Sequence, residues 1–386
     1  VPGQGEKHHV DIFTTRLDTL AGATYVAVSP ELAQKWLGIG WKAGAEVQKY
    51  IKEALGRRER EEETKDKSGV RTDVVAVNPI TNKDMPVFVS DYVLGAVGTG
   101  ALMGVPAHDA RDYEFAHKFE LPIVEVVIPS VIDTTNPPKE GKENTKRPII
   151  IGIVRDPKNG KYLVLKWKNQ PWKTFITGGI EGNEDPVTCA MREITEETGY
   201  QDLTFLRSLG HTEAFFYAAH KDVNRQTFAE CLLFELGSDA REQISPEEEA
   251  LHEVTWLSEK EVLQAHLQHA EFPIIWNRLK ADSTVFEEDG VLINSGEFSG
   301  IRSREARDKI AAAVDGKKTI TYKLRDWVFS RQRYWGEPIP MVHCVKDGWV
   351  PVEDKDLPVT LPKVDRYQPT DTGESPLAAI EKWVKT

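Results

Sequence analysis

Three carboxylates on one face of a predicted helix are the residues of this sequence best suited to do chemistry. Glu193, Glu196 and Glu197 are spaced i, i+3 and i+4, which brings their side chains together on a helix. Clustered carboxylates repel one another unless a hard divalent cation neutralises them, and Mg²⁺ prefers oxygen ligands together with substrate phosphates. Arg192 lies beside the cluster and can hold one carboxylate. The pattern favours a magnesium site over the alternative, a solvated acidic helix face.

The helix that must position these carboxylates has clear end signals. Asp185 can cap its start, Pro186 suits the first helical position, and Gly199 suits its end. An apolar stripe on another face would hold the helix against a core, and its members are Val187, Ala190, Met191 and Ile194. A helix of about four turns therefore follows the Gly-rich loop that begins at Gly178.

The whole segment from Gly178 to Tyr200 resembles the Nudix box. Gly178 is followed after five residues by Glu184, and after seven more by the run REITEETGY. The Nudix family hydrolyses nucleoside diphosphates linked to another group. The resemblance implies Mg²⁺ held by Glu193, Glu196, Glu197 and the backbone carbonyl of Gly178, with Glu196 also catalytic. It further implies a nucleotide-type small molecule as the ligand.

Two further polar clusters lie near the start of the chain. The first contains Thr14, Thr15, Arg16 and Thr19 between two apolar runs. The second follows a Gly-rich approach and contains a compact group of His and Asp side chains. Glycines let backbone approach a ligand, and such a group could bind an amino group or order a water. The alternatives are a capped turn in the first cluster and a helix capped by an Asp in the second. The residues of the second cluster are His108, Asp109, Arg111 and Asp112.

Four segments together resemble the editing domain of leucyl-tRNA synthetases, called connective peptide 1, and the return of the chain into the catalytic domain. They read FTTRLDT at 13–19, GTGALMGVPAHDARDYEFA at 98–116, DGVLINSGEFSGI at 289–301 and YKLRDWVFSRQRYWGEPIP at 322–340. They occur in the order in which the family has them. Two positions depart from the family pattern, since Leu17 replaces a proline and Val97 replaces an aromatic residue.

This resemblance implies an editing activity. A hydrophobic pocket separates ligands that differ by one methylene by only about 1–3 kcal/mol, so a second site must destroy wrong products. The implied reaction is hydrolysis of the ester of leucine tRNA mischarged with valine, isoleucine, methionine or norvaline. Orienting water suffices for an activated ester, so no metal or other cofactor is expected for editing.

The resemblance also assigns roles to individual residues. Asp112 would bind the α-amino group of the substrate, a charge-assisted contact, and Thr19 would block the leucine side chain. The remaining expected site residues either position substrate and water or line the same pocket. They are Thr14, Thr15, Arg16, Gly100, Val105, His108 and Asp109.

The predicted fold class is α/β (α+β), with one domain inserted into another. Residues 1–128 and 281–320 are expected to form a discontinuous, β-rich editing domain, and 129–146 a linker poor in apolar periodicity. Residues 147–280 show the order strands, helix, strands, helix, which suits a Nudix-type α/β/α sandwich. Residues 321–386 would be a partial return into the synthetase catalytic domain, in which arginines and aromatics mix.

Charge and cysteine content limit the partners and the cellular compartment that fit this sequence. The 386 residues carry 49 Lys and Arg against 61 Asp and Glu, so no global basic surface for nucleic acid exists. Three cysteines far apart favour a reducing, cytoplasmic setting, and no membrane segment is expected. Cys344 alone is too few thiolates for a structural zinc site, so none is predicted. The first residue, Val1, indicates a piece of a longer synthetase chain.

Three functions remain in consideration. In the first, the chain edits mischarged leucine tRNA by binding its aminoacylated 3′ end, and the insertion is an auxiliary module. Aminoacylation is not expected, because the ATP-binding signatures of the class are not found in this sequence. In the second, Nudix phosphohydrolase activity is the main function. In the third, the insertion is a non-catalytic element that docks tRNA, although an intact carboxylate cluster argues against a pure spacer.

Overall fold

The computed structural model describes residues 9–59, 68–95, 98–219, 221–265, 267–319, 339–363, 377 and 380–385. Val97 and most of the predicted return motif at 322–340 lie outside the described residues. The chain divides into two compact units, 1–318 and 319–386. No helix among the described residues is long and apolar enough to cross a membrane.

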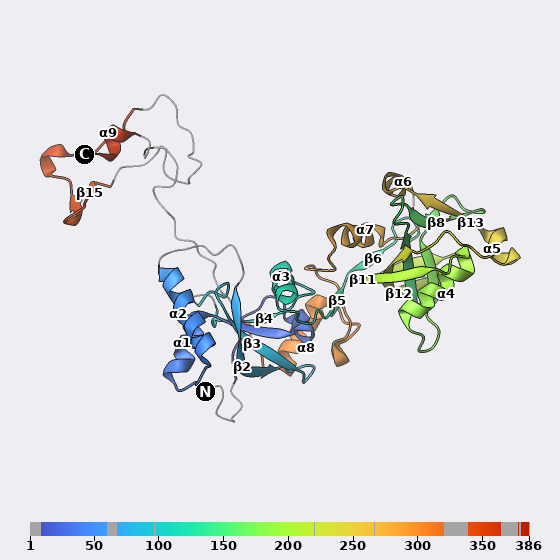
Figure 1. Cartoon of the computed structure of the whole chain (residues 1–386), viewed down its shortest axis with the longest axis horizontal. Coiled ribbons are helices and arrows are strands. Elements are labelled where there is room, and N and C mark those ends of the chain that lie inside the picture. The colour runs from blue at the N-terminus through green and yellow to red at the C-terminus, as the bar shows by residue number, and fades with distance from the viewer. Residues whose placement is uncertain are drawn as a thin grey trace. The chain divides into compact units, whose positions relative to one another are not determined.

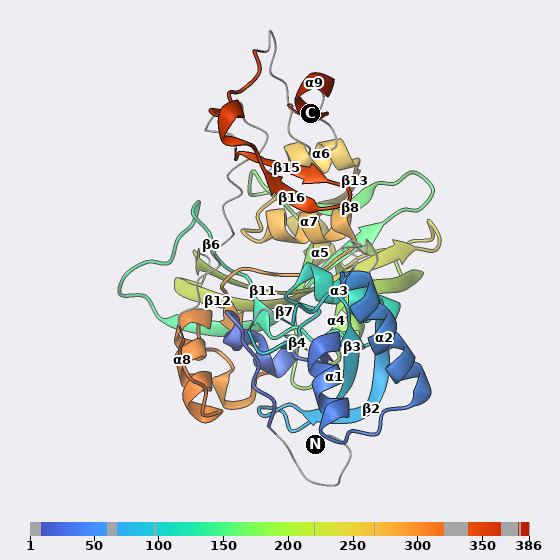
Figure 2. The same ribbon diagram turned by 90° about the vertical axis from the view of Figure 1, so that its left-hand side faces the viewer.

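The host domain is built on a mixed sheet of β1 (Tyr25–Val28), β2 (Gly69–Val77), β3 (Asp84–Ser90) and β4 (Ala101–Gly104). The strand order is β2-β3-β1-β4, with β1 parallel to β3 and the other pairs antiparallel. The predicted hairpin at residues 73–94 is confirmed as β2 and β3. Helices α1 (Pro30–Gly38) and α2 (Ala45–Glu59) lie side by side against β3 and β2 (Figure 2).

Further host elements carry the candidate editing residues and close the domain across the insertion. The 3₁₀ helix η1 (Leu17–Gly22) follows the threonine-rich segment, and α3 (Ala110–Lys118) follows the Gly-rich one. Strand β5 (Val127–Ile128) pairs with β14 (Val291–Leu292), which returns after the insertion. After β14 come η2 (Gly296–Phe298) and α8 (Ser303–Ala313), the helix predicted there. The host core therefore contains residues from both sides of the insertion.

The inserted domain has an eight-stranded sheet with a hydrophobic core on each of its two faces. Its main path is β13-β8-β7-β12-β11-β6, with β10 on β7 and β9 on β8 (Figure 1). The strands are β6 (Ser130–Ile132), β7 (Asn144–Arg155), β8 (Tyr162–Trp167), β9 (Lys173–Thr174), β10 (Ile176–Gly179), β11 (Leu203–Ala218), β12 (Val223–Leu236) and β13 (His252–Leu257).

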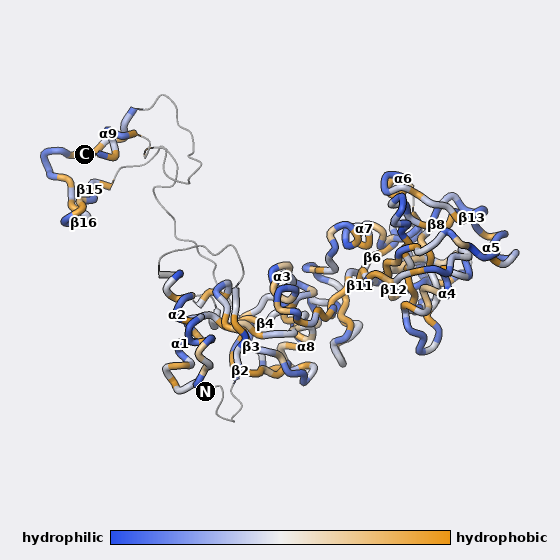
Figure 3. The backbone as a smooth tube through the Cα atoms, viewed as in Figure 1, coloured by the Kyte–Doolittle hydropathy of each residue, from blue (hydrophilic) through white to orange (hydrophobic). Residues whose placement is uncertain are grey.

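Helices cover both faces of this sheet, as the sequence predicts. Ile150 and Val154 of β7 face the box helix α4 (Pro186–Thr198), while Ile151 and Ile153 face the core under α6 (Glu259–Gln264) and α7 (Phe272–Ala281). A short helix, α5 (Pro246–Leu251), precedes β13. Figure 3 shows hydrophobic stretches along the strands of both sheets, which places each core against a sheet.

The structure differs from the sequence prediction at the domain crossing. The expected linker, residues 129–146, contains β6 and the first residues of β7, and both belong to the sheet of the inserted domain. β6 pairs in parallel with Glu213–Phe215 of β11. The polar composition of the segment concealed these strands, because edge positions need backbone partners more than apolar side chains. The sequence analysis also did not identify α7.

The second unit is small. β15 (Met341–Cys344) and β16 (Gly348–Pro351) form an antiparallel hairpin, followed by η3 (Asp354–Asp356) and the short helix α9 (Glu381–Val384). The thiol of Cys344 donates to the Asp347 carboxylate at 3.2 Å within this hairpin.

Candidate functional site

A buried carboxylate organises the threonine-rich segment of the host domain. Asp18 is fully buried and accepts from Arg16 Nε at 3.1 Å and from Arg307 Nε at 2.9 Å. Burial by itself raises the pKa of Asp18, but the hydrogen bonds from both arginines outweigh it and hold the pKa below its usual value. Asp18 is therefore ionised at neutral pH and fixes both guanidinium groups.

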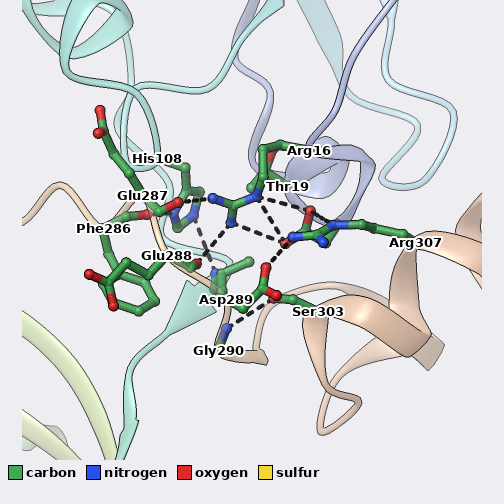
Figure 4. Close-up of polar contacts among 12 residues, drawn as sticks. Arg16, Thr19, His108, Phe286, Glu287, Glu288, Asp289, Gly290, Ser303 and Arg307 are labelled. Carbon is green, nitrogen blue, oxygen red and sulfur yellow. Dashed lines mark hydrogen bonds and ion pairs between the residues drawn. The ribbon is translucent and has the colours of Figure 1, made fainter. Parts of the chain in front are cut away.

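The same network joins the segments before and after the insertion. Arg16 also donates to the backbone carbonyls of Glu287 and Glu288, the latter at 3.1 Å. Arg307 of α8 pairs in addition with Asp289. Figure 4 shows these contacts converging from η1, from residues 286–290 and from α8. The motif at 13–19 thus reaches its position only when the returning chain supplies its partners.

The threonines of the motif are placed unequally. Thr14 Oγ1 accepts from the Arg16 amide at 3.0 Å, and Thr19 Oγ1 donates to the Arg16 carbonyl at 2.7 Å. Thr19 is fully buried, whereas Thr15 is exposed. The structure therefore brings Thr14, Arg16 and Thr19 together as one turn and leaves Thr15 at the surface of it.

Asp112 lies in the first turn of α3 with its carboxylate enclosed. Its Oδ2 accepts from the Val105 amide at 2.9 Å, and its Oδ1 accepts from Tyr25 Oη at 3.1 Å and Tyr92 Oη at 3.4 Å. The residue is 6% exposed, and burial raises the pKa of Asp112 to about 6. Val105 therefore acts through its backbone. Gly100, at φ 75°, shapes the approach and accepts from the Ser29 amide at 2.8 Å.

His108 and Asp109 are both held by hydrogen bonds to backbone groups of the host domain. His108 is buried, and its Nε2 accepts from the Val126 and Val127 amides at 3.0 and 3.2 Å. Because amides only donate, Nδ1 carries the proton and donates to the Phe286 carbonyl at 3.0 Å. Burial lowers the pKa of His108 to about 4, so the ring is neutral.

Asp109 is the N-cap of α3, as the alternative interpretation held. Its Oδ1 accepts from the Arg111 amide at 2.8 Å and from the Asp112 amide at 3.1 Å, and its other oxygen pairs with the Arg111 side chain. These bonds satisfy helix donors that otherwise have no partner. Asp109 therefore fixes the start of the helix that carries Asp112.

The predicted box helix of the inserted domain is confirmed at both ends. Asp185 caps α4 by accepting from the Thr188 amide at 2.9 Å, and Gly199 ends it at φ 80°. Gly178 packs so closely under Glu193 that a Cβ there would lie 2.1 Å from Glu193 Cγ. A glycine allows this close approach of the β10 backbone to the Glu193 side chain.

Arg192 is the central cation of the box. It binds both oxygens of Glu184, at 3.0 and 3.1 Å, and also Glu193 at 2.9 Å and Glu196 at 3.1 Å. Its side chain holds Glu184 and the helix face in one arrangement. Glu196 is mostly exposed, so it can exchange Arg192 for another cation with little rearrangement.

Glu197 supplies the observation that a metal would explain. Its Oε2 is buried and has no hydrogen-bond partner, and burial together with Glu193, Glu248 and Glu196 raises the pKa of Glu197 to about 8. Among the residues that the structure describes, no group of three or more His, Cys, Asp or Glu side chains is already arranged as a metal cluster. The orphaned oxygen, its acidic neighbours and the Gly178 approach nevertheless fit a hard divalent cation.

Several residues at these sites escaped the sequence analysis. Tyr25 and Tyr92 contact the Asp112 carboxylate, and Arg307 binds Asp18. None has a local signal, because each reaches the site through the tertiary fold.

Comparison with known families gives one match for the host domain and a second match for the inserted domain. Residues 2–151 match the family "Leucyl-tRNA synthetase, editing domain", and residues 145–275 match the NUDIX domain. The chain thus combines a region similar to leucyl-tRNA synthetase editing domains with a region similar to Nudix domains.

Curated relatives extend the match along the chain. It is 31% identical over 98% of its length to a leucine-tRNA ligase of Alkaliphilus oremlandii and 30% identical over 99% to one of Elusimicrobium minutum. A third, from Trichormus variabilis, is 31% identical over 99%. The chain spans 30%, 29% and 30% of these proteins, about a third of their length.

Two solved structures also match parts of the chain. The Agrobacterium radiobacter K84 agnB2 LeuRS, in a ternary complex with tRNA and LeuAMS, is 32% identical over 30% of this chain and 14% of its own, with TM-score 0.23. The C. elegans Ap4A hydrolase is 18% identical over 36% of this chain and 98% of its own, with TM-score 0.28. The family assignment rests on the sequence matches.

Replacing Asp18 with Asn should destabilise the editing domain by about 2–3 kcal/mol, because two arginines lose a buried ionic partner. The pKa of Asp18 is lowered, so its contribution is present above about pH 4 and is lost as the pH falls through the folded value. Urea unfolding measures the loss, and amide exchange in β5 and β14 should accelerate with it.

The matched control is Glu53→Gln, which removes an exposed i,i+4 pair with Lys49 in the same domain. That change should cost no more than about 0.5 kcal/mol. An Asp18→Asn variant with the stability of the control would show that the network does not hold the two segments together.

Proposed function

We propose that this chain is the proofreading part of a leucine-tRNA ligase and hydrolyses the ester of mischarged leucine tRNA. The observation that carries this proposal is the enclosed Asp112 carboxylate at the start of α3, within the region that matches the editing family. An aminoacyl ester differs from other esters of tRNA by its α-ammonium group. A carboxylate fixed in advance recognises that group by a charge-assisted hydrogen bond.

The turn at residues 14–19 orients the substrate and excludes the leucine side chain. Thr14 and Arg16 share a hydrogen bond, so the peptide that faces the substrate is rigid, and the exposed Thr15 hydroxyl is free to bind water or the terminal ribose. Thr19 is buried with its hydroxyl bonded to the Arg16 carbonyl, which leaves its methyl group as a fixed wall. A wall of this kind rejects the leucine side chain and admits smaller or unbranched ones.

We also propose a division of the chain into domains, a partner and a cellular location that are consistent with this function. Residues 1–128 and 281–320 form the editing domain, 147–280 the Nudix domain with the partly stranded 129–146 before it, and 321–386 the return toward a catalytic domain. Leucine tRNA is the partner, through its aminoacylated 3′ end, with the rest of a synthetase chain. The setting is the cytoplasm, where tRNA is charged.

Asp112→Asn should lower kcat/KM for deacylation of valyl- or norvalyl-leucine tRNA by roughly 10- to 100-fold, because a hydrogen bond to a charged partner contributes about 1.5–3 kcal/mol. The side chain keeps its shape, so the unfolding midpoint serves as the folding control. Unchanged deacylation by this variant would overturn the editing assignment.

Thr19→Ala should allow hydrolysis of correctly charged leucyl-tRNA, since the wall loses its methyl group. Thr19→Val is the matched control, because it keeps the bulk and removes only the hydroxyl that bonds to Arg16. Both variants are assayed with leucyl-tRNA and valyl-tRNA of the same leucine tRNA. Continued rejection of leucyl-tRNA by Thr19→Ala would contradict the blocking role.

We propose, as a second function, that the inserted domain is a Mg²⁺-dependent phosphohydrolase of nucleotide-type small molecules. The supporting observation is the orphaned Glu197 oxygen, which feels the charge of Glu193, a side chain that packs directly on Gly178. Glu193, Glu196, Glu197 and the Gly178 carbonyl would hold the ion, which when bound activates water and polarises the phosphate chain. Arg192 keeps Glu184 and Glu193 in place, and Glu196 acts as the catalytic carboxylate once it has left Arg192.

Mg²⁺ should raise the thermal midpoint of the inserted domain, and its apparent affinity should increase as the pH rises through about 8. Glu197 has a raised pKa, so below that pH a proton competes with the cation. Glu197→Gln should remove both effects and leave deacylation of tRNA intact. Asp239→Asn, an exposed pair with Lys158, is the control.

The outcome also separates the functions of the insertion. Cleavage of the phosphoanhydride in a panel of dinucleoside polyphosphates and nucleotide sugars, measured as nucleotide products, dependent on Mg²⁺ and absent in Glu197→Gln, supports a hydrolase. A Mg²⁺-independent midpoint together with no turnover would favour the tRNA-docking role instead.

A further inference from the structure

We propose that Tyr25 and Tyr92 are positioning residues that fix the rotamer of Asp112 and favour its ionised form. Recognition of the substrate amine then ends when acid protonates this carboxylate, and the two tyrosines set how acidic the solution must be. The inference rests on the proposed editing function of Asp112. It adds to that site one residue from β1 and one from the segment after β3. It also predicts that recognition of the substrate amine depends on pH.

The geometry is a closed triangle of polar atoms. Tyr25 Oη and Tyr92 Oη lie 2.9 Å apart, and both lie within hydrogen-bond distance of Asp112 Oδ1, at 3.1 and 3.4 Å. The Val105 amide donates to the other oxygen at 2.9 Å. Donors on both oxygens prevent the carboxylate from rotating, so its plane is set before any substrate arrives.

The count of acceptor positions leaves room for one more donor. An ionised carboxylate offers about four lone-pair positions, two on each oxygen. The two tyrosine hydroxyls, which have two protons for the three contacts among themselves and Oδ1, lie at Oδ1, and Val105 uses one position of Oδ2. The remaining position on Oδ2 is the one that an α-ammonium group would take.

Aromatic packing keeps the tyrosines in place. Tyr25 is fully buried and stacks on Phe115 with ring centroids 4.9 Å apart, and Tyr92 packs on the same ring at 5.5 Å. Phe115 lies three residues after Asp112 on α3, so one helical face carries both the carboxylate and the ring that supports its donors. Gly104 is required beside Tyr25, because a Cβ there would lie 2.0 Å from the ring.

The charges around Asp112 make it sensitive to pH in an accessible range. Burial raises its pKa to about 6, the Val105 amide and the Tyr25 hydroxyl lower the pKa, and on α3 Asp109 raises it while Arg111 lowers it. Burial and Asp112 raise the pKa of both tyrosines, so the phenols stay protonated and remain donors. Loss of a phenol therefore removes support for the ionised form.

The test compares the pH profile of deacylation in the unchanged chain, Tyr25→Phe and Tyr92→Phe. The unchanged chain should lose activity toward valyl-leucine tRNA as the pH falls through about 6. Each Phe variant keeps the ring and should move this acid limb upward by roughly one pH unit. Near pH 6 the loss is then several-fold.

Tyr200→Phe is the matched control, since it removes a buried tyrosine hydroxyl, bonded to Trp256 Nε1 at 3.1 Å, in the inserted domain. Its acid limb should stay in place. A second probe is the same tRNA esterified with the α-hydroxy analogue of valine, which lacks the ammonium group. Its hydrolysis should show no acid limb near pH 6, with or without the tyrosine hydroxyls.

A direct titration keeps the inference separate from the editing function. The ¹³C carboxyl resonance of Asp112, assigned with Asp112→Asn, should titrate near pH 6 and shift upward in both Phe variants. An unshifted titration overturns the tyrosine roles whatever the deacylation result. A shifted titration with no deacylation by the unchanged chain overturns the editing function and leaves the effect of the tyrosines on the carboxylate standing.

Discussion

The host domain depends on one buried ionic contact, the Asp18 carboxylate between Arg16 and Arg307. Asp18 and Arg307 are 289 residues apart, and the whole inserted domain lies between them in the chain. A fully buried carboxylate is costly unless cations and hydrogen bonds compensate it, so the turn at 14–19 takes its conformation only when the returning segment is in place. The same contact fixes Arg16 and, through its carbonyl, Thr19. The turn at 14–19 and the closure of the discontinuous host domain therefore form together.

A second set of charges lies where the chain crosses between the domains. Glu125, just before β5, binds Arg278 of α7 at 3.0 Å and His211 of β11 at 2.7 Å. Burial opposes a charge on His211, yet the hydrogen bonds that its ring donates to Glu125 and Glu230 outweigh it and raise the pKa of His211 to about 9. The positive charges of Arg278 and His211 thus compensate the acidic side chains at the crossing. β6 adds backbone pairing next to it, so the crossing is a structured part of the fold.

The two candidate sites use carboxylates in opposite ways. Asp112 is buried with hydrogen-bond donors at both of its oxygens, and one acceptor position is left for a further donor. Glu197 is buried with an oxygen that no donor reaches, and its neighbours are acidic, so only a proton or a cation relieves it. The first arrangement suits recognition of an ammonium group without reorganisation. The second suits a metal-dependent reaction on phosphates.

The sequence alone determined what depends on local spacing. The box helix has the predicted cap and end at Asp185 and Gly199, because capping and helical periodicity act over a few residues. The family and the insertion of one domain in another were also readable, since the motifs keep their order. Only the tertiary structure decided that His108 is a buried, neutral residue, that residues 129–146 contain sheet strands, and that Tyr25, Tyr92 and Arg307 contact the key carboxylates. Those outcomes depend on burial and on partners far away in the chain, and both are fixed by long-range packing that no short motif encodes.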